Sequence, residues 1–540
     1  MRMLSGVQKI ILKIQEASRT RATLSVAVLA LGGLISRVLG LIRDRLLAHT
    51  YGASEIVDIY VAAFRTPDFI FQSLMLGAFA AAAVPVLIAE RESHGNKGLI
   101  TLSNMLLTRI VFTMCLITLI VAFFTPSIVG YFFSHTSPEG KILLIDLTRI
   151  MLLTVPLFTA SSVASAILAS SRRFWSASWQ PVVYNIGILL GIVIANSTSE
   201  PRWLGVGVVI GACAHVTITY PELKRMGWKL SPSSFFTWSA RATSVLGLML
   251  PRSFSLVSQQ ISLTMIISII GTWGIGSISA YYFAHNVMSV PLGLIGISLS
   301  TVALPALTTA YHQQGNEGIG KALTRYLSIA GFLIGPLIWL LIVLRAQVVR
   351  LFLGSGNFDW NATYQTAQIL GIVAIGLLPA VISPLLIKSF FARENTRIPL
   401  LVSLIILPLS VGGAILGNTY GGLYGTVTMV SIISWIEFLL LLRMYEKYTG
   451  SLMPALLRMS TDVFFSGFIA GVGAWGALRV ANVFVSITTV PGLVLQTSTA
   501  IITAGVIYLF VQSWMGHPAM EIVSRYARDL QRSLKKTFAI

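Results

Sequence analysis

Residues 110–124 read Ile110-Val-Phe-Thr-Met-Cys-Leu-Ile-Thr-Leu-Ile-Val-Ala-Phe-Phe124, a run without a single charged residue. It is the middle of an apolar stretch that covers about residues 99–126. A helix needs about 20 apolar residues to cross the roughly 30 Å hydrocarbon layer of a membrane. The stretch is long enough, and its apolar residues are continuous rather than alternating, so it favours a transmembrane helix over a barrel strand.

Similar stretches recur along the chain of 540 residues. About fourteen are predicted, near residues 24–48, 56–89, 99–126, 143–171, 179–196, 203–220, 244–271, 278–311, 322–345, 363–390, 398–417, 420–442, 456–482 and 489–514. The composition agrees, because 55% of the residues are hydrophobic and only 11% are charged, whereas soluble domains have about 25% charged residues. The sequence therefore predicts an all-α membrane protein with about 14 transmembrane helices.

The net charge is +19, and the positions of the basic residues decide what this charge means. Lys and Arg gather in alternate connecting segments, beginning with the N-terminal tail at 1–22 and ending with the C-terminal tail at 517–540. By the positive-inside rule both tails are cytoplasmic, which an even number of spans requires. The basic charge is therefore assigned to membrane topology, and we expect no binding of nucleic acid.

The first apolar run continues into Arg37 without a small-residue cleavage site, so we expect an uncleaved first helix and no signal peptide. The two cysteines, Cys115 and Cys213, lie in separate predicted spans and lack metal-ligand spacing. Burial by packing is their expected role, and a disulfide is not expected. The seven histidines are scattered in the same way. We therefore expect no metal and no cofactor.

Three pairs of segments share one displacement of 220 residues. They are Ala83-Val-Pro-Val-Leu87 with Ala303-Leu-Pro-Ala-Leu307, Gly95-Asn-Lys-Gly98 with Gly315-Asn-Glu-Gly318, and Arg173 with Arg393. Each repeat contains six predicted spans, an even number, so both repeats keep the same orientation in the membrane. We predict an N-lobe at 23–222, a C-lobe at 223–447 and two further helices at 448–516. Such paired bundles are typical of alternating-access transporters; a duplicated bundle with a static or channel role is the alternative.

The first predicted helix carries charge on one side only. At 100° per residue, one arc of about 120° collects its small and polar residues. These are Gly33, Ser36, Arg37, Gly40, Arg43 and Asp44. An unpaired arginine at the depth predicted for Arg37 costs at least about 2.5 to 3.5 kcal/mol. Because guanidinium groups bind phosphate oxygens bidentately, this side predicts a binding site for a pyrophosphate-bearing substrate, with Gly33 and Gly40 leaving space.

The second predicted helix adds Asp58, Arg65 and Asp68, and Pro67 is expected to kink it. Asp58 and Arg65 share a face if the helix continues. The alternative for Arg37 or Arg65 is a permanent ion pair with Asp44, Asp58 or Asp68 that only holds helices together. The alternative for Arg43 is that its side chain extends to the membrane surface.

The second half of the chain offers one comparable stretch. His285, Asn286 and Ser289 precede Pro291 and make a polar break in the predicted span at 278–311. We predict that Asn286 lines the same substrate cavity and that Pro291 is a hinge. Packing between helices is the alternative explanation of this stretch.

The stretch Ser36-Arg37-Val-Leu-Gly40-Leu-Ile-Arg43-Asp44, with Tyr51-Gly52-Ala53, Asp58 and Phe64-Arg65-Thr-Pro67, resembles the MurJ (MviN) lipid II flippases. These belong to the multidrug/oligosaccharidyl-lipid/polysaccharide exporter superfamily. The likeness continues at Gly77-Ala78-Phe79 with Val84-Pro85-Val86, around Arg173-Phe174 and Pro181, and from Phe391-Ala392-Arg393 to Pro399.

The resemblance implies that Arg37, Arg43 and Asp58 are needed for transport, and that Arg65 stands at a basic position of the family. It also implies that the helices at 448–516 form a groove for the prenyl tail. The chain departs from the family pattern at Phe71, Leu76 and Asn286, where charged residues are common. A diverged substrate or a rewired cavity is therefore an alternative.

The expected function is to move lipid II, without covalent chemistry, from the inner to the outer leaflet of a bacterial cytoplasmic membrane by alternating access. The expected partners are lipid II or a similar undecaprenyl-pyrophosphate-linked saccharide and membrane lipids, with cell-wall synthesis proteins as candidates. One rival is a related transporter of another polyprenyl-linked saccharide. The other is a polytopic enzyme acting on lipid carriers, which needs an acid pair, histidine motif or metal cluster that the sequence does not offer.

Overall fold

Helices account for the regular structure of the chain wherever it is described. The computed structural model describes residues 31–75, 78–237, 239–450, 452–486, 489–521 and 524, and these residues contain no β-strand. The basic N-terminal tail predicted at 1–22 lies outside the described residues, as does most of the C-terminal tail. The prediction of an all-α membrane protein is confirmed.

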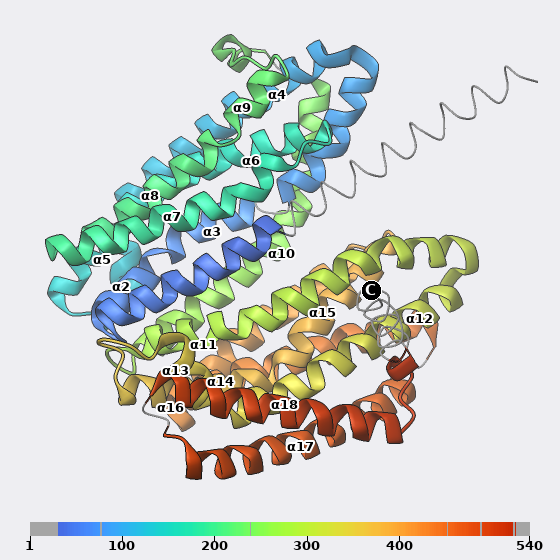
Figure 1. Ribbon diagram of the computed structural model, residues 1–540. Coiled ribbons are helices and arrows are strands. Elements are labelled where there is room, and N and C mark those ends of the chain that lie inside the picture. The colour runs from blue at the N-terminus through green and yellow to red at the C-terminus, as the bar shows by residue number, and fades with distance from the viewer. Residues whose placement is uncertain are drawn as a thin grey trace, which may run out of the picture. The chain divides into compact units, whose positions relative to one another are not determined.

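The chain divides into two compact units between Thr264 and Met265, and we describe each unit by itself (Figure 1). The first contains a helix at 31–51, followed by α2 (Glu55–Ala63), α3 (Arg65–Leu74), α4 (Ala78–Phe132), α5 (Pro138–Leu152), α6 (Thr154–Ser170), α7 (Trp175–Thr198), α8 (Arg202–Thr217), α9 (Tyr220–Arg225) and the 3₁₀ turn η1 (Pro232–Phe235). Helix α10 (Ala240–Gly271) contains the division.

The second unit continues from α10. Its elements are α11 (Ser277–Pro291), the π-helix η2 (Leu292–Ile297), α12 (Ser298–Val343), α13 (Arg345–Leu353), α14 (Trp360–Ile375), α15 (Leu377–Ala392), α16 (Arg397–Thr449), α17 (Met453–Phe484) and α18 (Val490–Trp514). Among the described residues, eight helices are long and apolar enough to cross a membrane, or nine if α14 and α15, bent by 42°, form one span. The number of fourteen stays a prediction, and it is consistent with these helices.

Three of the long helices contain a glycine with left-handed backbone. These are Gly95 in α4 (φ 64°), Gly315 in α12 (φ 61°) and Gly422 in α16 (φ 63°). A residue with a side chain rarely adopts this conformation, whereas glycine does so at little cost. Each of these glycines lies close to a gap that the sequence predicts between two spans. Helices α4, α12 and α16 therefore each contain residues of two predicted spans. Gly95 and Gly315 are also one of the residue pairs that the 220-residue repeat aligns; the lobe assignment itself stays a prediction.

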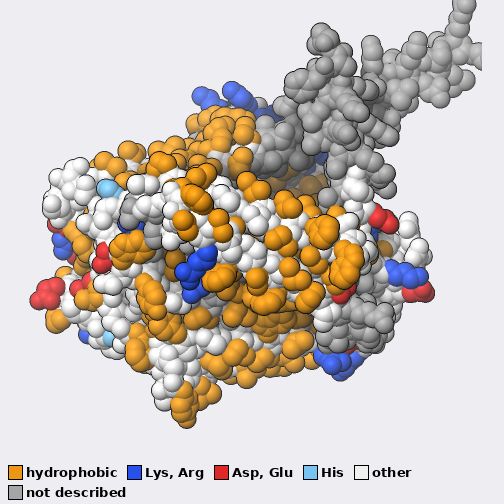
Figure 2. Space-filling view, turned by 60° about the horizontal axis from the view of Figure 1, so that its bottom comes forward, with side chains coloured by type: hydrophobic (Ala, Val, Ile, Leu, Met, Phe, Trp, Pro, Cys, Tyr) orange, Lys and Arg blue, Asp and Glu red, His pale blue; other side chains and the backbone are white. Residues whose placement is uncertain are grey.

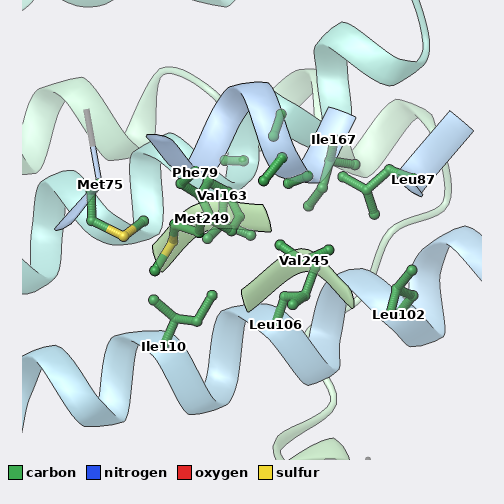
Figure 3. Packing of buried hydrophobic residues seen from close by; sticks show 14 of the residues in the cluster. Met75, Phe79, Leu87, Leu102, Leu106, Ile110, Val163, Ile167, Val245 and Met249 are labelled. Carbon is green, nitrogen blue, oxygen red and sulfur yellow. The ribbon is translucent and has the colours of Figure 1, made fainter. Parts of the chain in front are cut away.

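The core of the first unit includes the beginning of α10. Val245 and Met249 of α10 are buried in one cluster with Leu106 and Ile110 of α4 and Val163 of α6 (Figure 3). This part of the chain follows residue 222, where we placed the end of the N-lobe, yet it packs within the first unit. The structural division therefore falls later in the sequence than the predicted lobe boundary.

The connection before α10 is bound along α4. We call residues 226–237 the strap. The side chain of Asn104 donates to the carbonyl of Lys229 (3.0 Å) and accepts from the Ser231 N–H (2.9 Å). Trp228 Nε1 donates to Ser103 Oγ (3.0 Å), and Arg109 Nε donates to the Phe235 carbonyl (2.7 Å). The strap is thus held at several points and positions the start of α10.

Helices α7 and α8 approach each other at glycines. A Cβ added to Gly191 of α7 would lie 2.6 Å from Gly207 Cα, and one added to Gly187 would lie 2.3 Å from Gly211 Cα. Small residues at such positions let two membrane helices come into backbone contact, which increases their van der Waals attraction. The same glycines leave no room for a side chain.

In the second unit, α17 and α18 lie side by side and pack on α12 (Figure 1). Tyr508 of α18 donates to the Phe332 carbonyl of α12 (2.8 Å). A Cβ on Gly335 would lie 2.1 Å from Val463 Cγ1 of α17, so α12 and α17 are also in close contact. The face shown in Figure 2 carries many apolar side chains, as a lipid-exposed surface requires.

The prediction for the cysteines is wrong. The side chains of Cys115 in α4 and Cys213 in α8 are exposed, not buried. A thiol is compatible with a hydrocarbon environment because it behaves as a small apolar group. On a membrane-spanning helix, exposure to lipid carries no penalty that would force such a residue into the core.

Candidate functional site

The charged side of the first helix faces α7. Asn185 of α7 accepts a hydrogen bond from Arg43 NH1 (3.2 Å) and donates to Ser36 Oγ (3.2 Å). Arg43 also donates to Asp44 Oδ1 from Nε (3.0 Å) and from NH2 (2.8 Å). We call these four residues, Ser36, Arg43, Asp44 and Asn185, the Arg43 cluster.

The Arg43 cluster is partly withdrawn from the surface. The side chain of Asp44 is 6% exposed and that of Arg43 20%, while Asn185 is 7% exposed as a residue. A buried carboxylate needs a charged or hydrogen-bonding partner, and Arg43 provides both. In the structure the side chain of Arg43 therefore binds Asp44 and Asn185, and it does not simply extend to the membrane surface.

The sequence interpretation did not include Asn185 among the site residues. The only indication in the sequence was an amide side chain inside the apolar run at 179–196. Nothing near Asn185 in the sequence indicates that it contacts Arg43, which lies 142 residues earlier. Asp44 was considered as a partner of Arg37, whereas in the structure it pairs with Arg43. The two adjacent residues form a salt bridge in which Nε and NH2 of Arg43 both donate to Oδ1 of Asp44.

Arg37 differs from Arg43. Its side chain is half-buried, and it has no hydrogen bond or ion pair with any residue that the structure describes. Gly33 and Gly40, on the same side of the helix, have open space where a Cβ would point. The arrangement leaves the guanidinium donors of Arg37 available to a ligand, and the permanent ion pair considered as its alternative is not formed within the described part of the chain.

The second predicted helix is divided at its proline. Helix α2 ends at Ala63 and α3 begins at Arg65, with Pro67 in the first turn of α3. Proline has no N–H, so it cannot donate to the carbonyl four residues earlier, at Ala63. The helix is thus interrupted at Phe64, near the expected position, and the kink at Pro67 stays a prediction. Asp58 of α2 is buried, with 8% exposed.

Arg65 lies at the start of α3 with its side chain 13% exposed. Its NH2 donates to Asp68 Oδ2 (3.2 Å), so here the ion pair considered as the alternative is present. Its Nε is buried and has no partner among the described residues. Arg65 therefore keeps an unused donor in the interior of the first unit.

Asn286 belongs to α11 of the second unit and is half-buried. Its carbonyl accepts a hydrogen bond from Ser289 Oγ (2.7 Å). Just beyond it, the helix widens into the π-helix η2 directly after Pro291. The helical path continues through this π segment. Such segments are frequent at functional sites, and the hinge role of Pro291 stays a prediction. Ser36, Arg37, Arg43, Asp58 and Arg65 lie in the first unit and Asn286 lies in the second, so a cavity shared by all of them stays a prediction.

Fold and charge together define a class of protein: a multi-pass helical membrane protein with arginines held inside its first unit. Solved structures agree on the fold. The chain matches a structure titled "Lipid II flippase MurJ, inward closed conformation" with a TM-score of 0.75 and 21% identity, covering 92% of this chain and 100% of that one. An inward-facing multidrug resistance MATE family transporter matches with a TM-score of 0.66 and 14% identity, covering 81% of this chain and 99% of that one.

The family is shown by the sequence. The family described as "Lipid II flippase MurJ" matches residues 47–495, and the chain belongs to this family. A probable lipid II flippase MurJ of Buchnera aphidicola subsp. Acyrthosiphon pisum is 28% identical, over 89% of this chain and 95% of that protein. The lipid II flippase MurJ of Burkholderia cenocepacia is 25% identical, over 71% and 76%. Members of the family are membrane transporters and not enzymes.

Proposed function

We propose that this protein moves lipid II from the inner to the outer leaflet of the cytoplasmic membrane, with the pyrophosphate bound by arginines of the first unit. Membership of the MurJ family supports the substrate class. The observation that carries the role of the arginines is the half-buried Arg37, whose donors have no partner among the described residues. Arginine offers the planar fork that phosphate oxygens bind and stays charged when water is removed.

The remaining candidate residues fit the same proposal in different ways. Arg43 is held in place by Asp44 and Asn185, and Arg65 keeps a free Nε. In this proposal Arg37 makes the first contact with the pyrophosphate, while Arg43 and Arg65 add positive charge around it. Ser36, Asp58 and Asn286 stay proposed contacts, and Gly33, Gly40, Pro67 and Pro291 stay proposed flexible points.

The proposed transport cycle needs no covalent chemistry. The two units alternate between states open to either side of the membrane, as duplicated transporter bundles do. The prenyl tail travels in a groove of α17 and α18, whose exposed apolar residues such as Phe484 (80%) and Val483 (79%) are compatible with a lipid. We place both termini in the cytoplasm, with cell-wall synthesis proteins as candidate partners.

Complementation tests this function. The chain should restore growth to a bacterium depleted of its own lipid II flippase, and lipid II should again become accessible at the outer leaflet. The variant Arg37→Ala, made at equal abundance, is the matched negative control. If the wild-type chain accumulates in the membrane but does not restore growth, lipid II is not its substrate.

A second candidate is flipping of another polyprenyl-linked saccharide. It is favoured by Phe71, Leu76 and Asn286, which stand where the family commonly has charged residues. Restoring charge at these positions discriminates the two candidates. If Asn286→Arg converts a chain that fails complementation into one that succeeds, the natural substrate differs from lipid II in its head group.

A further inference from the structure

The first unit contains a cavity of about 420 Å³, within the range of volumes that bind small ligands. Its walls come from α3, the second half of α4 and the middle of α10. Apolar side chains such as Phe69, Ile117, Ile128 and Ile261 dominate the lining. Such a lining disfavours water, because water in a cavity needs several polar partners. An apolar ligand or an apolar part of a ligand suits it better.

Two buried donors in the same lining lack a partner among the described residues. Arg65 Nε is one, and Ser73 Oγ is the other. Ser73 is only 1% exposed. Buried donors are nearly always bonded in folded proteins, so something other than the described residues completes this cavity.

The walls of the cavity are tied together. Gln260 of α10 donates to Gln72 of α3 (2.8 Å), although these residues are far apart in sequence. The strap and the buried Val245 and Met249 fix the earlier part of α10 on α4. The cavity is therefore a feature built into the first unit.

The depth of Arg65 limits the identity of the ligand. Glu55 accepts a hydrogen bond from the Ser137 N–H (3.3 Å) in the connection between α4 and α5, so Glu55 marks one end of the helices. Arg65 follows ten residues later, about 15 Å along a helical path. This is about half of the roughly 30 Å hydrocarbon layer. A resident phospholipid keeps its phosphate at the surface, so a ligand that brings an anionic group to Arg65 is a lipid in transit.

We infer that the cavity binds the isoprenoid segment of the substrate that adjoins the pyrophosphate, with Arg65 contacting a phosphate oxygen. The inference rests on the proposed function and assigns one part of the substrate to the first unit. The apolar walls accept the first isoprene units, and the guanidinium at the edge of the cavity accepts the charge. Asp68 occupies one donor of Arg65, and Nε remains for the ligand.

The test fills the cavity without touching any arginine. Ser73→Leu removes an unpartnered hydroxyl and adds apolar volume, so it should fold well. Ile261→Phe adds volume from the opposite wall. The matched control is Ile142→Phe, since Ile142 lies on α5 with 60% of its surface exposed. The probes are geranylgeranyl pyrophosphate and inorganic pyrophosphate, titrated into the purified full chain.

We expect the wild type to bind geranylgeranyl pyrophosphate at least tenfold more tightly than pyrophosphate. Either filling variant should abolish that advantage while the affinity for pyrophosphate stays unchanged, and Ile142→Phe should behave as the wild type. Unchanged binding of the prenyl probe in both filling variants overturns the inference. If native mass spectrometry instead shows that they lose a retained phospholipid, the occupant is a resident lipid and the inference is equally wrong.

The experiments distinguish a failure of the proposed function from a failure of the cavity assignment. If the wild type does not complement but binds the prenyl probe in the cavity, the transported head group is misassigned and the cavity assignment stands. If the wild type and both filling variants complement and bind the probe equally, the function stands and the cavity assignment is wrong.

Discussion

Arg37 and Arg43 stand six residues apart on one helix and have different surroundings. Arg43 is bonded to Asp44 and Asn185, whereas Arg37 has no partner in the described part of the chain. The difference predicts different outcomes of mutation. Removing Arg43 takes the ion-pair partner from a buried carboxylate, whereas removing Arg37 breaks no hydrogen bond or ion pair with the described residues.

For Arg37 we predict that Arg37→Ala leaves the abundance of the protein in the membrane normal and abolishes complementation. Arg37→Lys keeps the charge but loses the bidentate fork, so it should be impaired, though less severely. Immunoblotting and growth after depletion measure the two effects. If Arg37→Ala instead lowers abundance, and either Asp44→Ala or Asp58→Ala restores both abundance and growth, Arg37 is a packing residue.

For Asn185 we predict a stability effect. Asn185→Leu removes the hydrogen bonds of Asn185 with Arg43 NH1 and Ser36 Oγ, and each lost bond costs about 0.5 to 1.5 kcal/mol. Thermal unfolding of the purified protein should therefore shift to lower temperature. Asn196→Leu, at an exposed position of the same helix, should leave the unfolding temperature unchanged. Equal stability of the two variants would mean that the Arg43 cluster makes no net contribution.

The helical period was sufficient to place Ser36 and Arg43 on one side of the first helix, and both contact Asn185 there. It could not identify Asn185, because that contact depends on how α7 packs on the first helix. It also could not identify the partner of Asp44, which the sequence left open as an alternative partner of Arg37 or Arg65. Spacing shows which side chains can meet, but the choice between Arg37 and Arg43 depends on tertiary packing.

At the scale of helices, hydropathy predicted where most spans lie, and the gaps between spans lie near Gly95, Gly315 and Gly422. It did not predict the breaks between α5 and α6 or between α14 and α15. Each of these was one predicted run, at 143–171 and 363–390. Both sides of each break are apolar, so a hydropathy profile contains no signal for it.

The glycine contact of α7 with α8 gives a prediction at this scale. Gly207→Ala places a methyl group 2.4 Å from Gly191 Cα, and such overpacking costs about 1 to 3 kcal/mol. The unfolding temperature in detergent should fall. Gly130→Ala is the control, since a Cβ there meets nothing within 4 Å and alanine favours a helix. Equal unfolding temperatures for both variants would refute the close contact.

At the scale of the whole molecule, the alternating basic segments predict the topology. Cys115 and Cys213 are first replaced by serine, because both are exposed. Single cysteines at Gly95 and Lys229 should then resist a membrane-impermeant thiol reagent in intact cells. Cysteines at Ser137 and Ser199 should react. Labelling at Gly95 or Lys229 would reverse the proposed orientation, and permeabilised cells, in which all four should react, provide the control.

The hydrogen bond between Arg43 and Asn185 also has a consequence for biogenesis. The two residues are 142 positions apart, and a ribosome adds about 5 to 20 residues per second. The first helix is therefore synthesised roughly 7 to 28 seconds before Asn185 exists. During that interval Arg43 lacks its contact with Asn185, so the insertion machinery must hold a charged helix until α7 follows. Assembly of the cluster is thus a late step of membrane insertion, and a nascent chain arrested before residue 185 should be a substrate for membrane proteases.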